Sequence, residues 1–113
     1  MNAVSEKQKI LVVDDDQHIA ELISLYLMKD GYDTQEVYDG KKALEAVTTY
    51  QPDLILLDVV MPVMDGYKVL QEMGANGLLD EVPVVVITAD NSLEGELRAF
   101  DLGASDIIVK PFE

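Results

Sequence analysis

The sequence predicts an α/β domain with a doubly wound, open sheet of five parallel strands. Four short runs of β-branched residues and leucine contain no alternating polar positions, which is typical of strands that are buried on both faces. These runs cover residues 10–13, 54–57, 84–87 and 107–109. Amphipathic helical patterns separate them, so strands and helices alternate along the chain. Strict alternation with short connections implies right-handed crossovers and helices on both faces of the sheet.

The first half of the chain predicts two strands, each followed by a helix. After the strand at 10–13, apolar residues at helical spacing predict a helix that stops at Gly31. Residues 33–38 form a weaker and more polar candidate strand, which suits a sheet edge. A second helix is expected behind Asp39 as its N-cap. The apolar faces of these helices consist of Ile19, Leu22, Ile23, Tyr26 and Leu27, and of Ala43, Leu44 and Val47.

The second half continues with three strands and two helices. The first of these helices is expected to begin behind Asp65 as its N-cap. The last helix is expected to begin behind Asn91, with Glu94 three residues later as its partner in a capping box, and to end before Gly103. The apolar faces of the two helices consist of Tyr67, Leu70 and Met73, and of Leu93, Leu97 and Phe100.

Length and composition fit a single domain, residues 1–113. A chain of 113 residues has no room for a second domain of ordinary size. It contains no cysteine, no signal-peptide pattern and no apolar stretch near the length of a membrane span, so a cytoplasmic location is expected. The net charge is −14, from 22 acidic and 8 basic residues, which argues against binding of nucleic acid or an anionic membrane surface by this domain.

The end of the predicted sheet lacks a covering helix. Only Pro111, Phe112 and Glu113 follow the last strand and its terminal Lys110. A doubly wound sheet needs helices on both faces, so we expect the domain to be truncated after this strand and to expose apolar surface from residues 107–109. Self-association through this surface, or a rearrangement of the last strand, is the expected consequence.

Chemically reactive side chains end four of the apolar runs. They are Asp14, Asp15, Asp58, Thr88 and Lys110. The carboxyl ends of parallel strands share one edge of a sheet, which is where open α/β sheets bind their ligands. These five side chains are therefore predicted to meet in one cleft. The neighbouring Asp16 is expected to cap the first helix.

The residue types in this cleft predict phosphoryl chemistry with a metal ion. Grouped carboxylates repel one another, so they need a proton or a cation between them. Oxygen ligands favour a hard cation, and Mg²⁺ typically takes one or two carboxylates together with phosphate oxygens. A remaining carboxylate can then attack phosphorus and form an acyl phosphate, while Lys110 and the Thr88 hydroxyl hold the phosphoryl oxygens.

Four segments around these residues resemble the signature segments of the receiver domain of two-component response regulators. They are residues 12–15 (VVDD), 57–66 (LDVVMPVMDG), 87–89 (ITA) and 109–112 (VKPF), in that order along nearly the whole chain. The resemblance implies the strand order 2-1-3-4-5 and a phosphorylation-dependent signalling switch. It further implies that a sensor histidine kinase or a phosphotransfer protein donates the phosphoryl group from a phosphohistidine, and that an output region or partner responds.

The resemblance also implies the phosphoryl acceptor and the metal ligands. Asp58 is implied as the phosphoacceptor and as a Mg²⁺ ligand, Asp15 as a direct Mg²⁺ ligand, and Asp14 as a ligand that acts largely through water. The backbone carbonyl of Val60 is implied as the remaining protein ligand. Val60 and Asp90 occupy positions that tune dephosphorylation in this family.

The residues that hold the phosphoryl group follow from the same resemblance. Thr88 is implied to bond a phosphoryl oxygen, Lys110 to pair with the phosphate, and the small Ala89 to leave room for it. A cis peptide bond is implied between Lys110 and Pro111. The chain departs from the family at Ile107, where the usual residue is Tyr or Phe, so the inward movement of an aromatic ring is not implied here.

Two other functions remain open from the sequence. Asp14 and Asp16 after an apolar strand match the first half of the Asp-x-Asp-x-Thr/Val motif of haloacid-dehalogenase-like phosphatases, although His18 occupies the position of the usual Thr or Val. A structural pseudo-receiver that binds partners without phosphorylation would have the same fold. Turnover of a small phosphate ester would identify the phosphatase, and Mg²⁺-dependent labelling by acetyl phosphate would exclude the pseudo-receiver.

Overall fold

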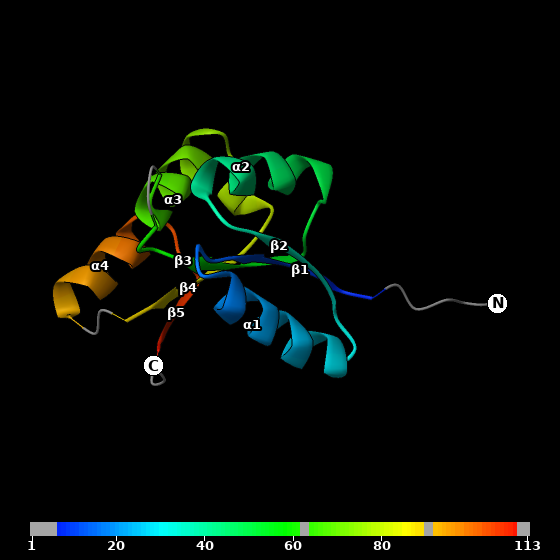
Figure 1. The fold of residues 1–113 in the computed structure, drawn as a ribbon. Coiled ribbons are helices and arrows are strands. Elements are labelled where there is room, and N and C mark those ends of the chain that lie inside the picture. Colours follow the sequence, from blue (N-terminus) through cyan, green and yellow to red (C-terminus); the bar gives the residue numbers. More distant parts are fainter. Residues whose placement is uncertain (1–6, 62–63, 90–91, 111–113) are drawn as a thin grey trace.

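A computed structural model describes residues 7–61, 64–89 and 92–110 and places five parallel strands in one sheet (Figure 1). The strand order is β2-β1-β3-β4-β5, which confirms the predicted order 2-1-3-4-5. The strands are β1 (Lys9–Val13), β2 (Asp33–Val37), β3 (Leu54–Asp58), β4 (Val84–Thr88) and β5 (Asp106–Val109). The helices of the described residues are α1 (Gln17–Lys29), α2 (Gly40–Thr49), α3 (Gly66–Ala75) and α4 (Leu93–Asp101), with a short 3-10 helix, η1 (Leu78–Asp80).

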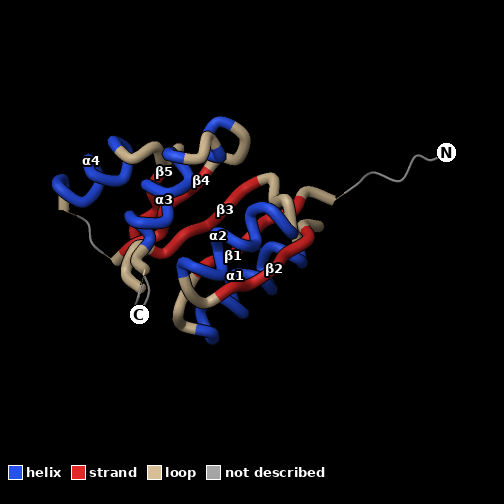
Figure 2. The backbone as a smooth tube through the Cα atoms, turned by 90° about the horizontal axis from the view of Figure 1, so that it is seen from above, coloured by secondary structure: helices blue, strands red, loops and turns tan. Residues whose placement is uncertain are grey.

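The sheet lies between two layers of helices, with α1 on one face and α2, α3 and α4 on the other (Figures 1 and 2). The pleat of β1 divides the core accordingly. Leu11 and Val13 pack in the cluster that contains side chains of α2, α3 and α4, whereas Ile10 and Val12 pack against Ala20 of α1. Because β1 and β3 are neighbours near the centre of the sheet, the residues that follow them lie side by side.

Aspartate or serine side chains cap the N-terminus of each α-helix. Asp16, Asp39 and Asp65 accept hydrogen bonds from backbone N–H groups at the starts of α1, α2 and α3, as predicted. The predicted N-cap of α4 is wrong, because the helix begins one residue later and Ser92 is its cap. The Ser92 Oγ accepts from the Gly95 N–H at 3.1 Å. The capping interaction is therefore shifted by one residue from the expected capping box, whose second member was Glu94. Asn91 itself lies outside the described residues.

Fewer residues of α1 are buried than the predicted apolar face contains. Ala20 and Ser24, four residues apart, are buried against the sheet, whereas Leu22 and Tyr26 are 47% and 65% exposed. The sequence predicts an apolar face that includes Leu22 and Tyr26, but the hydrophobic cluster on this side of the sheet contains no side chain of another described helix. No helix in the described parts of the chain has the length and apolar character needed to span a lipid bilayer.

Within the described residues, one face of β5 is uncovered, as the sequence predicted. Ile107 packs against the core on the side of α2, α3 and α4. Ile108, which points to the opposite face because side chains alternate along a strand, is 49% exposed. On the face of the sheet that α1 covers, no described helix packs against β5.

Candidate functional site

Three carboxylates converge at the carboxyl edge of the sheet. Asp14 and Asp15 follow β1, and Asp58 is the last residue of β3. Val13 pairs with Leu57 in the register of the two strands, so the residues that come next are neighbours. One oxygen from each of the three carboxylates lies within 4.8 Å of the others. Asp14 and Asp58 are buried, at 2% and 5% exposure, while Asp15 is exposed.

Backbone N–H groups fix the two buried carboxylates. The Asp14 Oδ1 accepts from the Asp16 N–H at 3.0 Å, and the Asp58 Oδ1 accepts from the Val60 N–H at 2.9 Å. After each of the two aspartates the chain therefore turns, so that the backbone N–H two residues later donates to the carboxylate. The second oxygen of each carboxylate, Oδ2, takes no part in these two hydrogen bonds.

Lys110 takes both of these second oxygens. Its Nζ lies 3.4 Å from the Asp14 Oδ2 and 3.3 Å from the Asp58 Oδ2. The residue follows β5, and its backbone N–H donates to the Thr88 carbonyl at 2.7 Å, which ties the end of β5 to the end of β4. A single ammonium group thus bridges two buried carboxylates that are 44 positions apart in the sequence.

The charges of the site act on one another. Burial raises the pKa of the Asp14 carboxyl, and the nearby Asp58 carboxylate raises it further, against the opposing effects of the Asp16 N–H and the Lys110 ammonium. Burial alone would lower the pKa of Lys110, but Asp58 and Asp14 together raise it. Lys110 is therefore charged at neutral pH. Three carboxylates face one ammonium, so the site has a surplus of negative charge that a metal cation would offset.

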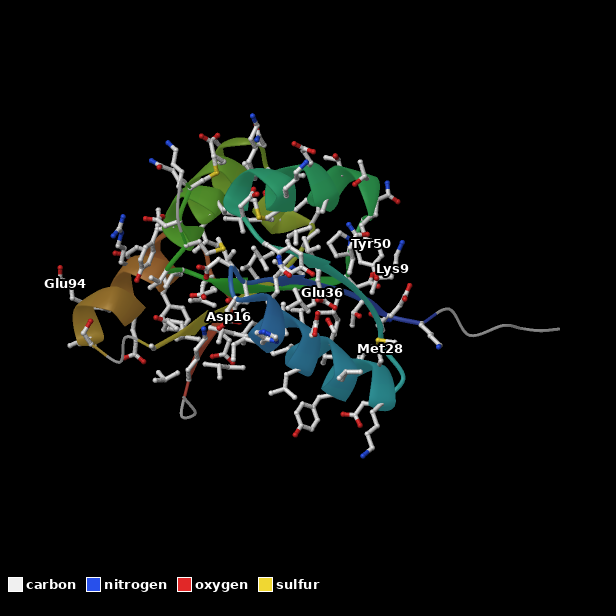
Figure 3. The ribbon with its side chains drawn as sticks, viewed as in Figure 1. Lys9, Asp16, Met28, Glu36, Tyr50 and Glu94 are labelled. Carbon is white, nitrogen blue, oxygen red and sulfur yellow. The ribbon has the colours of Figure 1, made fainter. Side chains whose placement is uncertain are left out.

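The site opens into a cavity of about 360 Å³. The residues that line it are Asp14, Asp15, Asp16, Asp58, Val60, Ala89 and Lys110. Seen in Figure 3, Asp16 stands near the start of α1, at the opposite end of the strands from Lys9 and Tyr50. The cavity has the volume for a phosphoryl group and water molecules, and its walls supply only oxygen ligands, one ammonium and small or apolar side chains.

Thr88 lies beside the cavity but does not line it. It ends β4, one residue after Ile87, the partner of Asp58 in the strand register, and it is 4% exposed. The structure thus brings Asp14, Asp15, Asp58 and Lys110 together in one cavity, which Val60 also lines. Thr88, which was predicted in the same cleft, is not part of the lining and is joined to the site through the hydrogen bond between its carbonyl and the Lys110 N–H. The predicted cis bond at Pro111 and the predicted role of Asp90 concern residues outside the described part of the chain.

Two contributions to the site were not found in the sequence. Asp16 was assigned only as a helix cap, yet its backbone N–H fixes Asp14 and it also lines the cavity. Gly66 has no predicted role beyond its place at the end of segment 57–66, yet its N–H donates to the Val59 carbonyl at 3.1 Å and α3 begins against the end of β3. A Cβ atom at Gly66 would lie 2.5 Å from the Asp58 carbonyl oxygen.

The chain matches the family described as the response regulator receiver domain over residues 10–113. Among curated relatives, the DNA-binding dual master transcriptional regulator RpaA of Synechocystis sp. is 38% identical over 105 residues, which are 93% of this chain and 44% of RpaA. The DNA-binding response regulator MtrA of Mycobacterium tuberculosis is 40% identical over 107 residues, or 95% of this chain and 46% of MtrA. The chain spans less than half the length of these relatives.

Solved structures have the same fold. The receiver domain of the Francisella response regulator 1452 matches with a TM-score of 0.87 and 34% identity, over 95% of this chain and 87% of that one. The Vibrio cholerae chemotaxis protein CheY4 matches with a TM-score of 0.88 and 30% identity, over 96% of this chain and 90% of that one.

Proposed function

The chain belongs to the response regulator receiver family, and from that premise we propose that Asp58 accepts a phosphoryl group in a Mg²⁺-dependent reaction. Receiver domains of this family interact with histidine kinases and generally bind Mg²⁺ at an acidic cluster. The donor proposed for this chain is the phosphohistidine of a sensor histidine kinase or of a phosphotransfer protein. The modified domain then controls an output region or a partner.

The bridge that Lys110 forms between Asp14 and Asp58 is the observation that carries this proposal. It places an ammonium group that is charged at neutral pH within reach of a carboxylate that a backbone N–H already holds in one orientation. A group oriented before the reaction needs little rearrangement in the transition state, which lowers the barrier. An ordinary surface ion pair joins exposed side chains, whereas Lys110 contacts two buried carboxylates at the ends of neighbouring strands.

The acidic cluster fits a Mg²⁺ site. Asp14, Asp15 and Asp58 offer carboxylate oxygens within 4.8 Å of one another, and Val60 lines the same cavity, where its backbone carbonyl is the proposed fourth protein ligand. An all-oxygen set with an open side suits a hard cation that retains water and binds phosphate oxygens. When bound there, Mg²⁺ would neutralise phosphoryl oxygens and hold them close to Asp58.

The proposed reaction is an in-line displacement at phosphorus. An Asp58 carboxylate oxygen forms a bond to phosphorus while the bond from phosphorus to the donor imidazole nitrogen breaks, and the imidazole leaves with that electron pair. Lys110 exchanges one carboxylate contact for a phosphoryl oxygen, and the Thr88 hydroxyl donates to another. Later attack by water on phosphorus releases phosphate and restores the carboxylate.

The output proposed by analogy is regulation of a DNA-binding region. RpaA and MtrA are both named as DNA-binding regulators, and this chain corresponds to less than half of each. The domain itself has a net charge of −14, which disfavours contact with a phosphate backbone. Any binding of DNA is therefore proposed for a region outside this domain.

The phosphatase alternative is less well supported by the same geometry. It requires a second catalytic carboxylate at Asp16. The Asp16 Oδ1 instead accepts from the N–H groups of His18 and Ile19 at 3.0 Å and 3.3 Å, and so serves as the cap of α1. An oxygen held in this way by the helix is poorly placed to protonate a leaving group.

Labelling with acetyl phosphate in the presence of Mg²⁺ tests the proposal. The unaltered chain should acquire one acid-labile phosphoryl group, and Asp58→Asn should abolish it because the nucleophilic oxygen is replaced by an amide. Asp15→Asn should raise the Mg²⁺ concentration needed for half-maximal labelling. Intact-mass measurement after timed incubation gives both results.

Asp80→Asn is the matched control, since Asp80 is an exposed aspartate in η1. This variant should label as the unaltered chain does. Undiminished labelling of Asp58→Asn would remove the assignment of the phosphoacceptor. A complete lack of labelling of the unaltered chain would favour a pseudo-receiver.

A further inference from the structure

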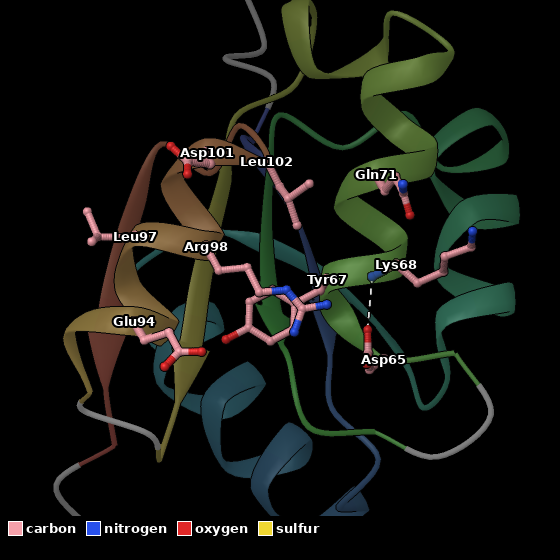
Figure 4. Close-up of a pocket in the computed structure, with 9 residues that line it drawn as sticks. All are labelled: Asp65, Tyr67, Lys68, Gln71, Glu94, Leu97, Arg98, Asp101 and Leu102. Atoms are coloured by element: carbon pink, nitrogen blue, oxygen red, sulfur yellow. Dashed lines mark hydrogen bonds between the residues drawn. The ribbon is translucent and has the colours of Figure 1, made fainter.

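We propose that the stacking of Arg98 on Tyr67 is a latch that holds α4 against α3 while Asp58 is unmodified and thereby opposes phosphorylation. The guanidinium carbon of Arg98, in α4, lies 4.0 Å from the centroid of the Tyr67 ring, in α3 (Figure 4). This is the distance of a favourable cation–π contact. The inference rests on the proposed function, because it describes how a change at Asp58 reaches α4.

The helix α4 is weakly anchored to the rest of the molecule. Ala99 is its only buried residue. Its three large apolar side chains, Leu93, Leu97 and Phe100, are 69%, 54% and 47% exposed. Elements with few buried contacts move at the lowest cost in free energy, so a single specific contact has a large share in fixing the position of such a helix.

Two hollows next to the stack leave α4 room to move. A groove of about 670 Å³ lies between α3 and α4, lined by residues that include Gln71, Leu97 and Leu102. A second hollow of about 270 Å³ is lined in part by Ser92 and Gly95, and Tyr67 and Arg98 line both. The two helices do not interdigitate here as a packed core would, so α4 can shift against α3 without compressing buried side chains.

The start of α3 lies next to the phosphorylation site, and α4 begins shortly after Thr88 in the sequence. Gly66, the first residue of α3, is hydrogen bonded to the Val59 carbonyl immediately after Asp58. Thr88 ends β4, and the cap of α4, Ser92, follows only four residues later. Because Ser92 is so close to Thr88 in the sequence, a turn of the Thr88 hydroxyl toward a phosphoryl group on Asp58 is expected to shift α4 relative to α3.

Such a movement breaks the stack, and Arg98 then has other partners. Glu94 and Asp101 line the same groove and lie four residues before and three residues after Arg98 on α4, which is the spacing of ion pairs within a helix. A contact present only in the unmodified state reduces the affinity of the site for a phosphoryl group by the same factor by which phosphorylation weakens the contact. Removing the stack should therefore favour the modified state.

The affinity of the site for beryllium trifluoride in excess Mg²⁺ tests the latch, since this anion mimics a phosphoryl group on a carboxylate. Arg98→Gln and Tyr67→Leu should each tighten binding about two- to fivefold, the factor that corresponds to a cation–π contact at an exposed site. The double variant should bind no more tightly than either single variant, because both remove the same contact. Calorimetric titration gives the dissociation constants.

Two further variants serve as controls. Tyr67→Phe keeps the ring, so its affinity should be closer to that of the unaltered chain than to that of Tyr67→Leu. Lys68→Gln removes a cation from the same groove that pairs with Glu72 within α3, at 3.6 Å, and should leave the affinity unchanged. An equal gain in Lys68→Gln would mean that net charge, and not the stack, sets the affinity, and would overturn the latch.

The remaining outcomes separate the latch from the proposed function. An unchanged dissociation constant in Arg98→Gln, with or without a loss of stability, would make the stack a structural contact and overturn the inference alone. Additive effects in the double variant would do the same. Failure of the unaltered chain to bind beryllium trifluoride, or equal binding by Asp58→Asn, would overturn the proposed function and the latch together.

Discussion

Asp14 and Asp58 share the ammonium of Lys110, and their burial makes each of them sensitive to the loss of a neighbour. Both carboxylates are less than one-tenth exposed, and Asp15 adds a third negative charge at the rim. Without a bound cation the single ammonium cannot balance them, so the unfilled site costs stability. Binding residues that lower the stability of the empty protein are common at functional sites.

In buffer free of divalent cations, Asp14→Asn should be more stable than the unaltered chain. Because burial raises the pKa of Asp14 in the folded chain, the folded state holds the proton more tightly than the unfolded state does. The ionised carboxyl therefore lowers the free energy of unfolding at neutral pH, and this effect develops as the pH rises from about 3.8 through the raised pKa. Asp14→Asn should therefore stabilise the protein at pH 7, because the amide is not penalised by burial as the ionised carboxyl is.

Urea denaturation at neutral pH and near pH 3.8 provides the measurement. The gain should shrink at the acidic end, where Asp14 is protonated in the folded chain. Excess Mg²⁺ should reverse the sign at pH 7, since the unaltered site then gains binding energy that the variant lacks. Loss of stability in Asp14→Asn at pH 7 without metal would contradict this account of the charges.

At the scale of secondary-structure elements, the site depends on how closely α3 approaches the end of β3. Gly66 permits that approach. A Cβ atom there would lie 2.5 Å from the Asp58 carbonyl oxygen and 2.6 Å from the Val59 Cα, both backbone atoms that cannot rotate away. Any larger residue must push the start of α3 away from the strand that carries Asp58.

Gly66→Ala should therefore lower the free energy of unfolding by about 1 to 3 kcal/mol, as overpacking does in well-packed interiors. It should also slow the labelling of Asp58, because the strand end that positions the carboxylate is displaced. Denaturation midpoints and labelling rates by mass measurement test the two effects.

Gly74→Ala in the same helix is the control. A Cβ atom at Gly74 would meet only the Leu79 Cδ1, at 3.4 Å, so alanine should be neutral or stabilising by about 0.5 to 1 kcal/mol. Equal stabilities of the two variants would show that the close approach at Gly66 has no energetic consequence.

The strands, and the edge of the sheet that carries the site, could be predicted from the sequence. A strand that is buried on both faces consists of a continuous run of apolar residues, which is easily recognised. The run at residues 10–13 falls within β1 (Lys9–Val13), and the polar residues that end such runs formed the site. The start of α4 could not be predicted, since neighbouring residues can both act as caps and the choice depends on where the helix begins. Likewise, only packing in three dimensions decides that Thr88 lies beside the cavity, or that Gly66 touches β3.

At the scale of the whole molecule, the two faces of the sheet are covered unequally. Three helices cover one face of the described structure, whereas α1 alone lies on the other. Ile108 in the edge strand β5 is 49% exposed on the less covered face. Exposed apolar residues on an edge strand favour pairing with another copy.

We expect this chain to self-associate at high concentration through the exposed face of β5. Ile108→Lys should lower the associated fraction, because a charged side chain on an edge strand opposes contact between strands. Its stability should change little, as Ile108 is half exposed. Light scattering over a concentration series measures the association.

Leu25→Lys, at a 63% exposed position on α1, is the control and should associate as the unaltered chain does. A strict monomer at all concentrations would contradict the prediction for β5. Equal effects of the two lysine substitutions would attribute association to overall charge.

Asp58 is the central residue of the proposed switch, since it receives the phosphoryl group with the help of a divalent cation. The most direct measurement is to phosphorylate the unaltered chain from a phosphohistidine donor and to identify the modified residue by mass spectrometry of peptides. We predict one acid-labile phosphoryl group, on Asp58, that is absent when Mg²⁺ is chelated. Modification of a different residue, or equal modification of Asp58 without a divalent cation, would contradict the account.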